Sequence, residues 1–183
     1  MYQETPEADT TELQITETTE TTETTETSKS IHIHALYGHA LSVTVARVLG
    51  YRAEQDKEEP EYWNLYTPDN RIVNSSRNKD SVWNRVPDFS GDAEDCLKLQ
   101  ASQGISVHLH HADTPEKAYV QAVCKYGPFD TEFGPAGRLA RANVPGISPE
   151  TICIAVCRAF LKAREEQDAE IQRRKTQHMK ETV

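Results

Sequence analysis

The chain has 183 residues, of which 29 are acidic and 20 are basic, so its formal net charge at pH 7 is −9. A protein with this acidic balance does not attract nucleic-acid phosphates, which bind clusters of lysine and arginine. No apolar run approaches the roughly 20 residues that cross a bilayer, and the first residues lack the apolar core of a signal peptide. We therefore expect a cytoplasmic protein of one domain with extensions, without a membrane or nucleic-acid partner.

The N-terminal segment, residues 1–30, differs from the rest of the chain in composition. It holds eight acidic residues and one lysine, so it carries −7 and leaves −2 for the remainder. Residues 16–27 read TETTETTETTET and contain no apolar side chain. Such a stretch cannot bury enough surface to offset the entropy of ordering. The composition therefore predicts a disordered acidic tail.

Folded structure is predicted to begin near Ala40 with an amphipathic helix that stops at Gly50. Its apolar stripe, at the spacing of one helix face, would consist of Leu41, Val45, Val48 and Leu49. Residues 52–61 are strongly charged, and we interpret them as a connector.

A β-hairpin is predicted next. Residues 62–66 and 71–73 are rich in aromatic and β-branched side chains, and the turn sequence TPDN stands between them. Residues 76–87 are interpreted as a loop.

A second helix is predicted over residues 87–102. Ser90 or Asp92 can accept hydrogen bonds from the free N–H groups of its first turn, and Gly104 lies just beyond its end. The side chains expected to face the core are Cys96, Leu97 and Ala101.

Two strands are predicted over residues 104–113 and 117–127, because apolar and polar side chains alternate there. The buried face of the second strand would carry Val120, Ala122 and Cys124. Residues 127–148 are rich in glycine and proline, and we interpret them as an irregular loop.

The clearest helix is predicted to begin at Ser148, which can cap it, with Pro149 in its first turn. Its apolar stripe would consist of Ile152, Val156, Ala159, Phe160 and Ala163. After Ala163 the sequence is almost wholly polar, so the end of this helix should project into solvent, including the RRK sequence at 173–175.

Together these elements predict an α+β fold, in which a small antiparallel sheet of three to four strands packs with about three helices in an α/β/α-type sandwich. The predicted organisation is a disordered tail at 1–30, a domain at 40–164 and a polar helical extension at 165–183. Small sheets with open edges often pair with a second copy, so we expect a homodimer.

Three histidines lie within four positions in ISVHLHHAD, residues 105–113. His108 and His110 share one face of the predicted strand, and His111 points the other way or lies in the turn. Two such histidines bind zinc only with a third or fourth ligand, which His32 and His34 of IHIH, residues 31–34, and His39 can supply. No carboxylate stands at a recognisable ligand spacing. We therefore interpret His108 and His110 as surface residues and weak metal candidates, and we expect no cofactor.

Catalytic motifs are not found in the sequence. It contains no GxSxG nucleophile elbow and no glycine-rich phosphate loop. The four cysteines, at 96, 124, 153 and 157, form no CxxC pair, and reduced buried cysteines behave as small apolar residues. An enzymatic role is therefore not favoured.

Aromatic side chains gather around the predicted hairpin and suit either the core or an interface, since tyrosine and tryptophan combine apolar area with a polar group. Basic residues, including Arg77, lie close to them in the sequence. The candidate ligand-binding residues are Tyr62, Trp63, Tyr66, Arg71, Trp83 and Arg85.

The order of elements and three sequence motifs resemble the phage ABA sandwich domain family of small phage and prophage proteins. The motifs are VARVLGY at 45–51, VPDFSGDAEDCLKL at 86–99 and ISPETICIAVCRAFLKA at 147–163. The strongest matches are Pro87, Phe89, Ser90 and Asp92, followed by Ile152 to Ala163. The resemblance covers roughly residues 40–164. It implies a sheet covered by helices and a phage or prophage origin, hence the cytoplasm of a bacterial host, but it supplies no activity that can be carried over.

Our first functional hypothesis is a non-enzymatic accessory protein that binds a protein partner or a small molecule. The second is a histidine-based metal-binding protein, with hydrolytic activity as one possibility. The third is a sponge that sequesters a host signalling nucleotide at the aromatic and basic residues of the hairpin region.

Overall fold

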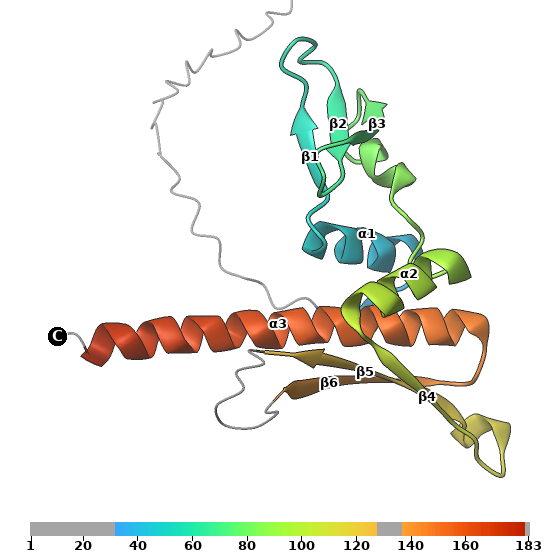
Figure 1. The fold of residues 1–183 in the computed structure, drawn as a ribbon. Coiled ribbons are helices and arrows are strands. Elements are labelled where there is room, and N and C mark those ends of the chain that lie inside the picture. The colour runs from blue at the N-terminus through green and yellow to red at the C-terminus, as the bar shows by residue number, and fades with distance from the viewer. Residues whose placement is uncertain (1–31, 128–136, 182–183) are drawn as a thin grey trace, which may run out of the picture. The chain divides into compact units, whose positions relative to one another are not determined.

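One long helix, α3 (Pro149–Glu181), organises the fold, and α1, α2, β5 and β6 pack against it (Figure 1). The structure is a computed structural model that describes residues 32–127 and 137–181. The predicted tail and the middle of the predicted loop lie outside these residues. The other elements are α1 (Gly38–Val48), β1 (Arg52–Gln55), β2 (Trp63–Tyr66), β3 (Ile72–Ser76), α2 (Ala93–Gln103), β4 (Ser106–His110), β5 (Tyr119–Tyr126) and β6 (Arg138–Pro145).

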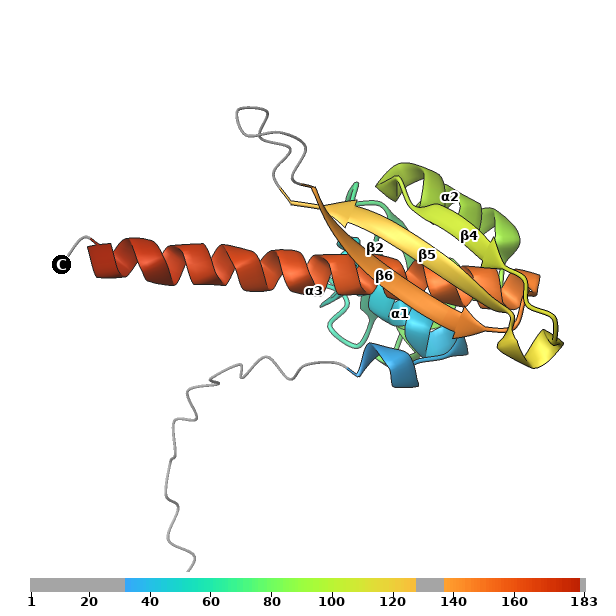
Figure 2. The same cartoon turned by 90° about the horizontal axis from the view of Figure 1, so that it is seen from below.

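The predicted α+β class is confirmed. Among the described residues the structure has three α-helices, and its six strands form two antiparallel sheets with the orders β1-β2-β3 and β4-β5-β6. The strands were expected to form a single sheet. They form two because β3 pairs only with β2, while β4 begins a second meander after α2. α3 forms the middle layer, with β5 and β6 on one side and α1 and α2 on the other (Figures 1 and 2).

The contact between α3 and the second sheet is lined by small side chains. The predicted buried face of β5 is confirmed, since Val120, Ala122 and Cys124 are all at most 4% exposed. Alanines also occupy the facing positions of the neighbouring elements, which lets the helix approach the sheet closely. They are Ala140 and Ala142 on β6 and Ala155, Ala159 and Ala163 on α3, each at most 2% exposed.

β6 corrects the prediction of an irregular loop over residues 127–148. It pairs with β5 along its whole length, from Tyr119↔Pro145 to Tyr126↔Arg138. Its inward residues are two alanines and Val144, which give only a weak apolar alternation. The glycines and prolines around the strand were therefore the stronger signal in the sequence, and they indicated a loop.

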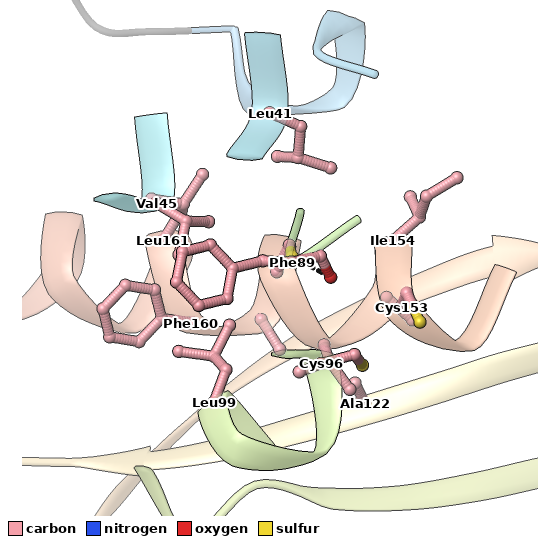
Figure 3. Close-up of a cluster of buried hydrophobic side chains, with 14 of the residues drawn as sticks. Leu41, Val45, Phe89, Cys96, Leu99, Ala122, Cys153, Ile154, Phe160 and Leu161 are labelled. Carbon is pink, nitrogen blue, oxygen red and sulfur yellow. Dashed lines mark hydrogen bonds between the residues drawn. The ribbon is translucent and has the colours of Figure 1, made fainter. Parts of the chain in front are cut away.

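The other side of α3 is covered by α1 and α2 (Figure 3). Leu41 and Val45 are buried as predicted, but Val48 is 43% exposed. On α2, Cys96 is buried as predicted, whereas Leu97 is 61% exposed and Leu99 takes the buried position.

The face of α2 is set by its N-terminal contacts. The Asp92 carboxylate accepts hydrogen bonds from the N–H groups of Glu94 and Asp95, which confirms it as the cap. The Asp95 carboxylate in turn accepts from the Asp88 N–H at 3.0 Å. These bonds fix the rotation of the helix so that Cys96 and Leu99, and neither Leu97 nor the exposed Ala101, turn toward α3.

The first sheet contains a strand that was predicted as a connector. β1 pairs with β2 from Arg52↔Tyr66 to Gln55↔Trp63. Its side chains are polar apart from Ala53, so the sequence shows no apolar alternation. The predicted loop after β3 contains a 3₁₀ helix, Ser81–Arg85, whose Val82 and Trp83 are buried in the core.

The start of α3 agrees with the prediction. The Ser148 hydroxyl accepts a hydrogen bond from the Thr151 N–H at 3.1 Å and thus caps the helix. From Cys153 to Leu161 every residue is buried, because the helix has neighbours on both sides there. Residues 171–180 are all exposed, as expected for the polar extension.

Candidate functional site

A cleft of about 470 Å³ lies where the end of α1, the β2–β3 turn and α2 meet. The turn lies at the TPDN sequence, residues 67–70, where it was predicted. The Thr67 N–H donates a hydrogen bond to the Arg71 carbonyl at 2.8 Å. Asn70 adopts a left-handed conformation with φ of 62°, which asparagine tolerates well. The lining residues are Leu49, Tyr51, Thr67, Pro68, Asp69, Arg71, Pro87, Phe89, Asp95, Lys98, Leu99 and Ser102.

The cleft combines an apolar floor with a charged rim. Phe89 and Leu99 belong to the buried core, and they form the inner part of the lining. On the rim, Arg71 lies 3.0 Å from Asp69, and Lys98 lies 3.6 Å from Asp95. Each cation thus has a carboxylate partner, and the rim has no net charge.

Tyr51 supplies a hydroxyl group to this cleft. Partial burial raises the pKa of Tyr51, and the nearby Asp95 and Asp69 carboxylates raise it further, against the opposing effect of Arg71. The phenol therefore remains protonated at neutral pH, where it can donate or accept a hydrogen bond.

The predicted aromatic and basic residues do not converge on one site. Alternation along β2 places Trp63 on one face of the first sheet and Tyr66 on the other. Trp83 is buried, with the Arg47 guanidinium 4.7 Å from its ring centroid. Arg85 is exposed at the end of the 3₁₀ helix.

The aromatic rings around the first sheet are each covered by a cation. Arg77 lies 5.2 Å from the Tyr62 ring, and Arg52 lies 5.2 Å from the Tyr66 ring. Lys79 lies 4.8 Å from the Trp63 ring. Of the six predicted ligand-binding residues, only Arg71 lines the cleft.

The two candidate metal ligands lie on the face of the second sheet that is turned away from α3. His108 pairs across the sheet with Gln121, and His110 pairs with Tyr119. The His110 and Tyr119 rings are stacked, with centroids 4.3 Å apart and planes 7° from parallel. Within residues 32–127 and 137–181, no three histidine, cysteine, aspartate or glutamate side chains are placed to hold a metal ion.

A serine–aspartate cluster joins α1 to the start of α2, and sequence reasoning missed it. The Ser42 hydroxyl donates to the Asp88 carboxylate at 2.9 Å and accepts from the Ser90 N–H at 3.1 Å. The Ser90 hydroxyl donates to the Gly38 carbonyl at 2.9 Å. Ser42 and Ser90 are almost fully buried, so these bonds tie two segments together. Ser90 thus stabilises the chain in a different way from the cap we predicted.

Cysteine side chains fill the contact between α2 and α3. Cys96 on α2 and Cys153 on α3 are both buried in this contact (Figure 3), and the Cys157 thiol donates to the Phe89 carbonyl at 3.3 Å. Burial, reinforced by Cys153, raises the pKa of Cys96 from 9.0 to about 12. Burial also raises the pKa values of Cys124 and Cys157. All four cysteines are free and buried, as predicted for core thiols.

The four thiols should react with 5,5′-dithiobis(2-nitrobenzoic acid) at least about a hundredfold more slowly in the folded protein than in urea, because burial makes them inaccessible and raises the pKa values of Cys96, Cys124 and Cys157. Since the pKa of Cys96 is raised on folding, its proton adds stability that is complete below pH 9 and declines as the pH rises toward 12. Absorbance at 412 nm measures the reaction, and rapid labelling of a thiol in the folded protein would contradict this assignment.

No family model, curated protein or solved structure matches the chain. The resemblance to the phage ABA sandwich family therefore stays a prediction. Among the described residues no helix is both long and apolar enough to cross a bilayer.

Proposed function

We propose that this protein is a non-enzymatic binding module and that the cleft between α1, the β2–β3 turn and α2 is its ligand site. The observation that carries the proposal is the composition of the cleft, which has a buried apolar floor, a tyrosine hydroxyl and a charge-balanced rim. Small-molecule sites are typically concave, mainly apolar and provided with a few polar groups. Because the rim carries no net charge, the expected ligand is neutral or zwitterionic with an apolar body.

The environment of the nearby polar groups supports binding over catalysis. The Ser42 and Ser90 hydroxyls are buried within a hydrogen-bonded cluster, so neither is presented to the cleft as a nucleophile. The Cys157 thiol lies behind Phe89 and has a raised pKa, whereas reactive cysteines have lowered values. The Tyr51 phenol also has a raised pKa, which suits a hydrogen-bond donor.

A screen of neutral and zwitterionic aromatic fragments tests the proposal by protein-observed NMR on the full chain. We expect the amide shifts to gather at Tyr51, at residues 67–71 and at Lys98–Ser102. Arg71→Gln and Tyr51→Phe should each weaken the best fragment about three- to tenfold, since each removes one polar contact.

Arg77→Gln is the matched control for Arg71→Gln. Its guanidinium is also exposed and paired with a carboxylate, Glu61 at 3.6 Å, but it does not line the cleft. Fragment binding should therefore be unchanged in this variant. Shifts that map elsewhere, or fragments that bind Arg71→Gln and Tyr51→Phe as tightly as the unmodified chain, would refute the assignment.

The narrower hypotheses stay predictions. They include a phage or prophage origin, a protein partner, a homodimer, a histidine metal site and a nucleotide sponge at the hairpin. Native mass spectrometry of the full chain, freshly purified from cells, addresses several of them together, since a zinc ion, a nucleotide or a second copy would each add its own mass.

A further inference from the structure

The charges that line the ligand cleft act together on the Tyr51 hydroxyl. Burial is the main reason why the pKa of Tyr51 is raised, and the Asp95 and Asp69 carboxylates raise it further, while Arg71 lowers it. All three charged side chains line the cleft together with Tyr51. Two negative charges thus act on this hydroxyl against one positive charge. Although the rim as a whole is neutral, the position beside the Tyr51 oxygen favours a positively charged group of a ligand.

Asp95 has one carboxylate oxygen that is only weakly paired. Its Oδ2 atom accepts the hydrogen bond from the Asp88 N–H at 3.0 Å, which fixes the side chain, and only 26% of the side chain is exposed. Its Oδ1 atom lies 3.6 Å from the Lys98 nitrogen, whereas that nitrogen lies 2.8 Å from Glu94, which does not line the cleft. Lys98 is therefore paired mainly with Glu94, and Oδ1 of Asp95 can accept a hydrogen bond from a ligand.

The β2–β3 turn holds Arg71 on a different wall of the cleft. The Thr67 hydroxyl accepts a hydrogen bond from the Arg71 N–H at 3.1 Å. The turn also lies directly on the end of α1, where a β-carbon at Gly50 would stand 3.7 Å from the Pro68 ring. A guanidinium carries five N–H donors, so the ion pair of Arg71 with Asp69 leaves others for a ligand. A ligand between the turn and α2 therefore meets a guanidinium from one wall and a carboxylate from the other.

The remaining lining accepts an apolar group. Its apolar side chains are those of Leu49, Pro68, Pro87, Phe89 and Leu99. The volume of about 470 Å³ lies within the range, roughly 300–1,000 Å³, that is typical of small-molecule sites. Since Arg71 and Asp95 both act on Tyr51, the positive and negative groups of a matching ligand must lie close together. An α-amino acid with an apolar side chain has this arrangement, because its ammonium group and its carboxylate are attached to the same carbon atom.

We propose that the cleft binds a free α-amino acid with an apolar side chain. The ammonium group of the ligand donates to Asp95 and to the Tyr51 oxygen, its carboxylate accepts from Arg71, and its side chain lies against Phe89 and Leu99. The amino-acid assignment rests on the proposed function, because it concerns the same cleft. The N-terminal residue of a peptide shares the ammonium group and the side chain, but it has no free carboxylate beside them.

The first test compares ligands by NMR titration of the unmodified full chain. L-leucine, L-phenylalanine and L-tryptophan are the probes. The best of them is then compared with its amide, which lacks the carboxylate, and with its N-acetyl derivative, which lacks the ammonium group. We expect saturable shifts at Tyr51, at residues 67–71 and at residues 95–102 with the free amino acid. Each derivative should bind about tenfold more weakly, because each loses one charge-assisted contact.

The second test assigns each contact to its side chain. Asp95→Asn should weaken the free amino acid about tenfold but leave the binding of its N-acetyl derivative unchanged, since that derivative does not make the ammonium contact. Arg71→Gln should likewise weaken the free amino acid about tenfold and leave the binding of its amide unchanged. Asp113→Asn is the matched control for Asp95→Asn, because it changes an exposed carboxylate that does not line the cleft. Arg77→Gln again serves as the control for Arg71→Gln, and neither control should alter binding.

Failure of the amino-acid assignment can be told apart from failure of the ligand site itself. If neutral aromatic fragments bind in the cleft but none of the three amino acids binds saturably up to about 10 mM, the amino-acid assignment is overturned and the ligand site stands. If neither fragments nor amino acids bind there, both are overturned. An N-acetyl derivative that binds as tightly as the free amino acid would refute the ammonium contact. An amide that binds as tightly would replace the free amino acid by the N-terminal residue of a peptide. Asp95→Asn and Arg71→Gln chains that bind like their controls would refute the assigned contacts.

Discussion

Replacing Leu99 by alanine should lower the free energy of unfolding by about 3 kcal/mol, whereas Leu97→Ala should change it by less than about 0.5 kcal/mol. Both leucines are on α2, two positions apart, but Leu99 is 2% exposed and Leu97 is 61% exposed. Removal of the Leu99 side chain leaves a cavity against α3. Removal of the Leu97 side chain leaves no cavity, because that side chain is mostly in contact with solvent. Urea denaturation followed by circular dichroism measures both changes.

This pair of variants also tests which face of α2 is buried. The same residue type on the same helix keeps the helix propensity and the unfolded state nearly constant. Equal losses of stability for Leu97→Ala and Leu99→Ala would contradict the observed rotation of α2. A larger loss for Leu97→Ala would support the face that the sequence alone predicted.

Replacing Arg158 by alanine should cost about 2–4 kcal/mol of stability, because the side chain is buried and its charged hydrogen bonds have no substitute. Arg158 is only 4% exposed. Its guanidinium donates to the carbonyl groups of His34 at 2.8 Å and Leu36 at 3.1 Å, and it lies 4.5 Å from the centroid of the Tyr37 ring. It thereby attaches the segment before α1 to α3.

Arg158→Lys should recover only part of this loss, since an ammonium group cannot bond both carbonyls as a planar fork does. Arg173→Ala, an exposed arginine further along the same helix, is the control and should change stability by less than about 0.5 kcal/mol. Hydrogen exchange at residues 35–41 should accelerate in Arg158→Ala. Unchanged stability and unchanged exchange together would show that the segment is held in another way.

The sequence predicted those parts of the fold that local signals specify. Asp92 and Ser148 cap their helices through short side-chain bonds to the next turn, and such bonds depend only on neighbouring residues. The alternation of Val120, Ala122 and Cys124 likewise identified the buried face of β5. Helix and hairpin positions therefore followed from the pattern.

The elements that were missed depend on tertiary contacts. β1 is a polar strand that exists because it pairs with β2. β6 pairs with β5 and buries alanines against α3. The small side chains of alanine give little periodic signal in the sequence. The burial of Ser42 in place of Val48 on α1 depends on hydrogen bonds to Asp88 and Ser90, more than forty positions away.

The candidate sites were less predictable still. Aromatic residues suggested one site at the hairpin, but alternation along β2 places Trp63 and Tyr66 on opposite faces. The cleft combines residues from 49 to 102, and no short motif marks such a set.

The central position of α3 has a consequence for synthesis on the ribosome. α1, α2, β5 and β6 all bury their apolar faces against a helix that follows them in the chain. At about 5–20 residues per second, α1 leaves the ribosome about 6–23 s before residue 164 does, and β6 leaves it about 1–4 s before. The domain therefore cannot complete its core progressively from the N-terminus. In the interval its exposed apolar surfaces are the ones that a holdase chaperone would recognise, and the release of α3 commits the chain to its native state.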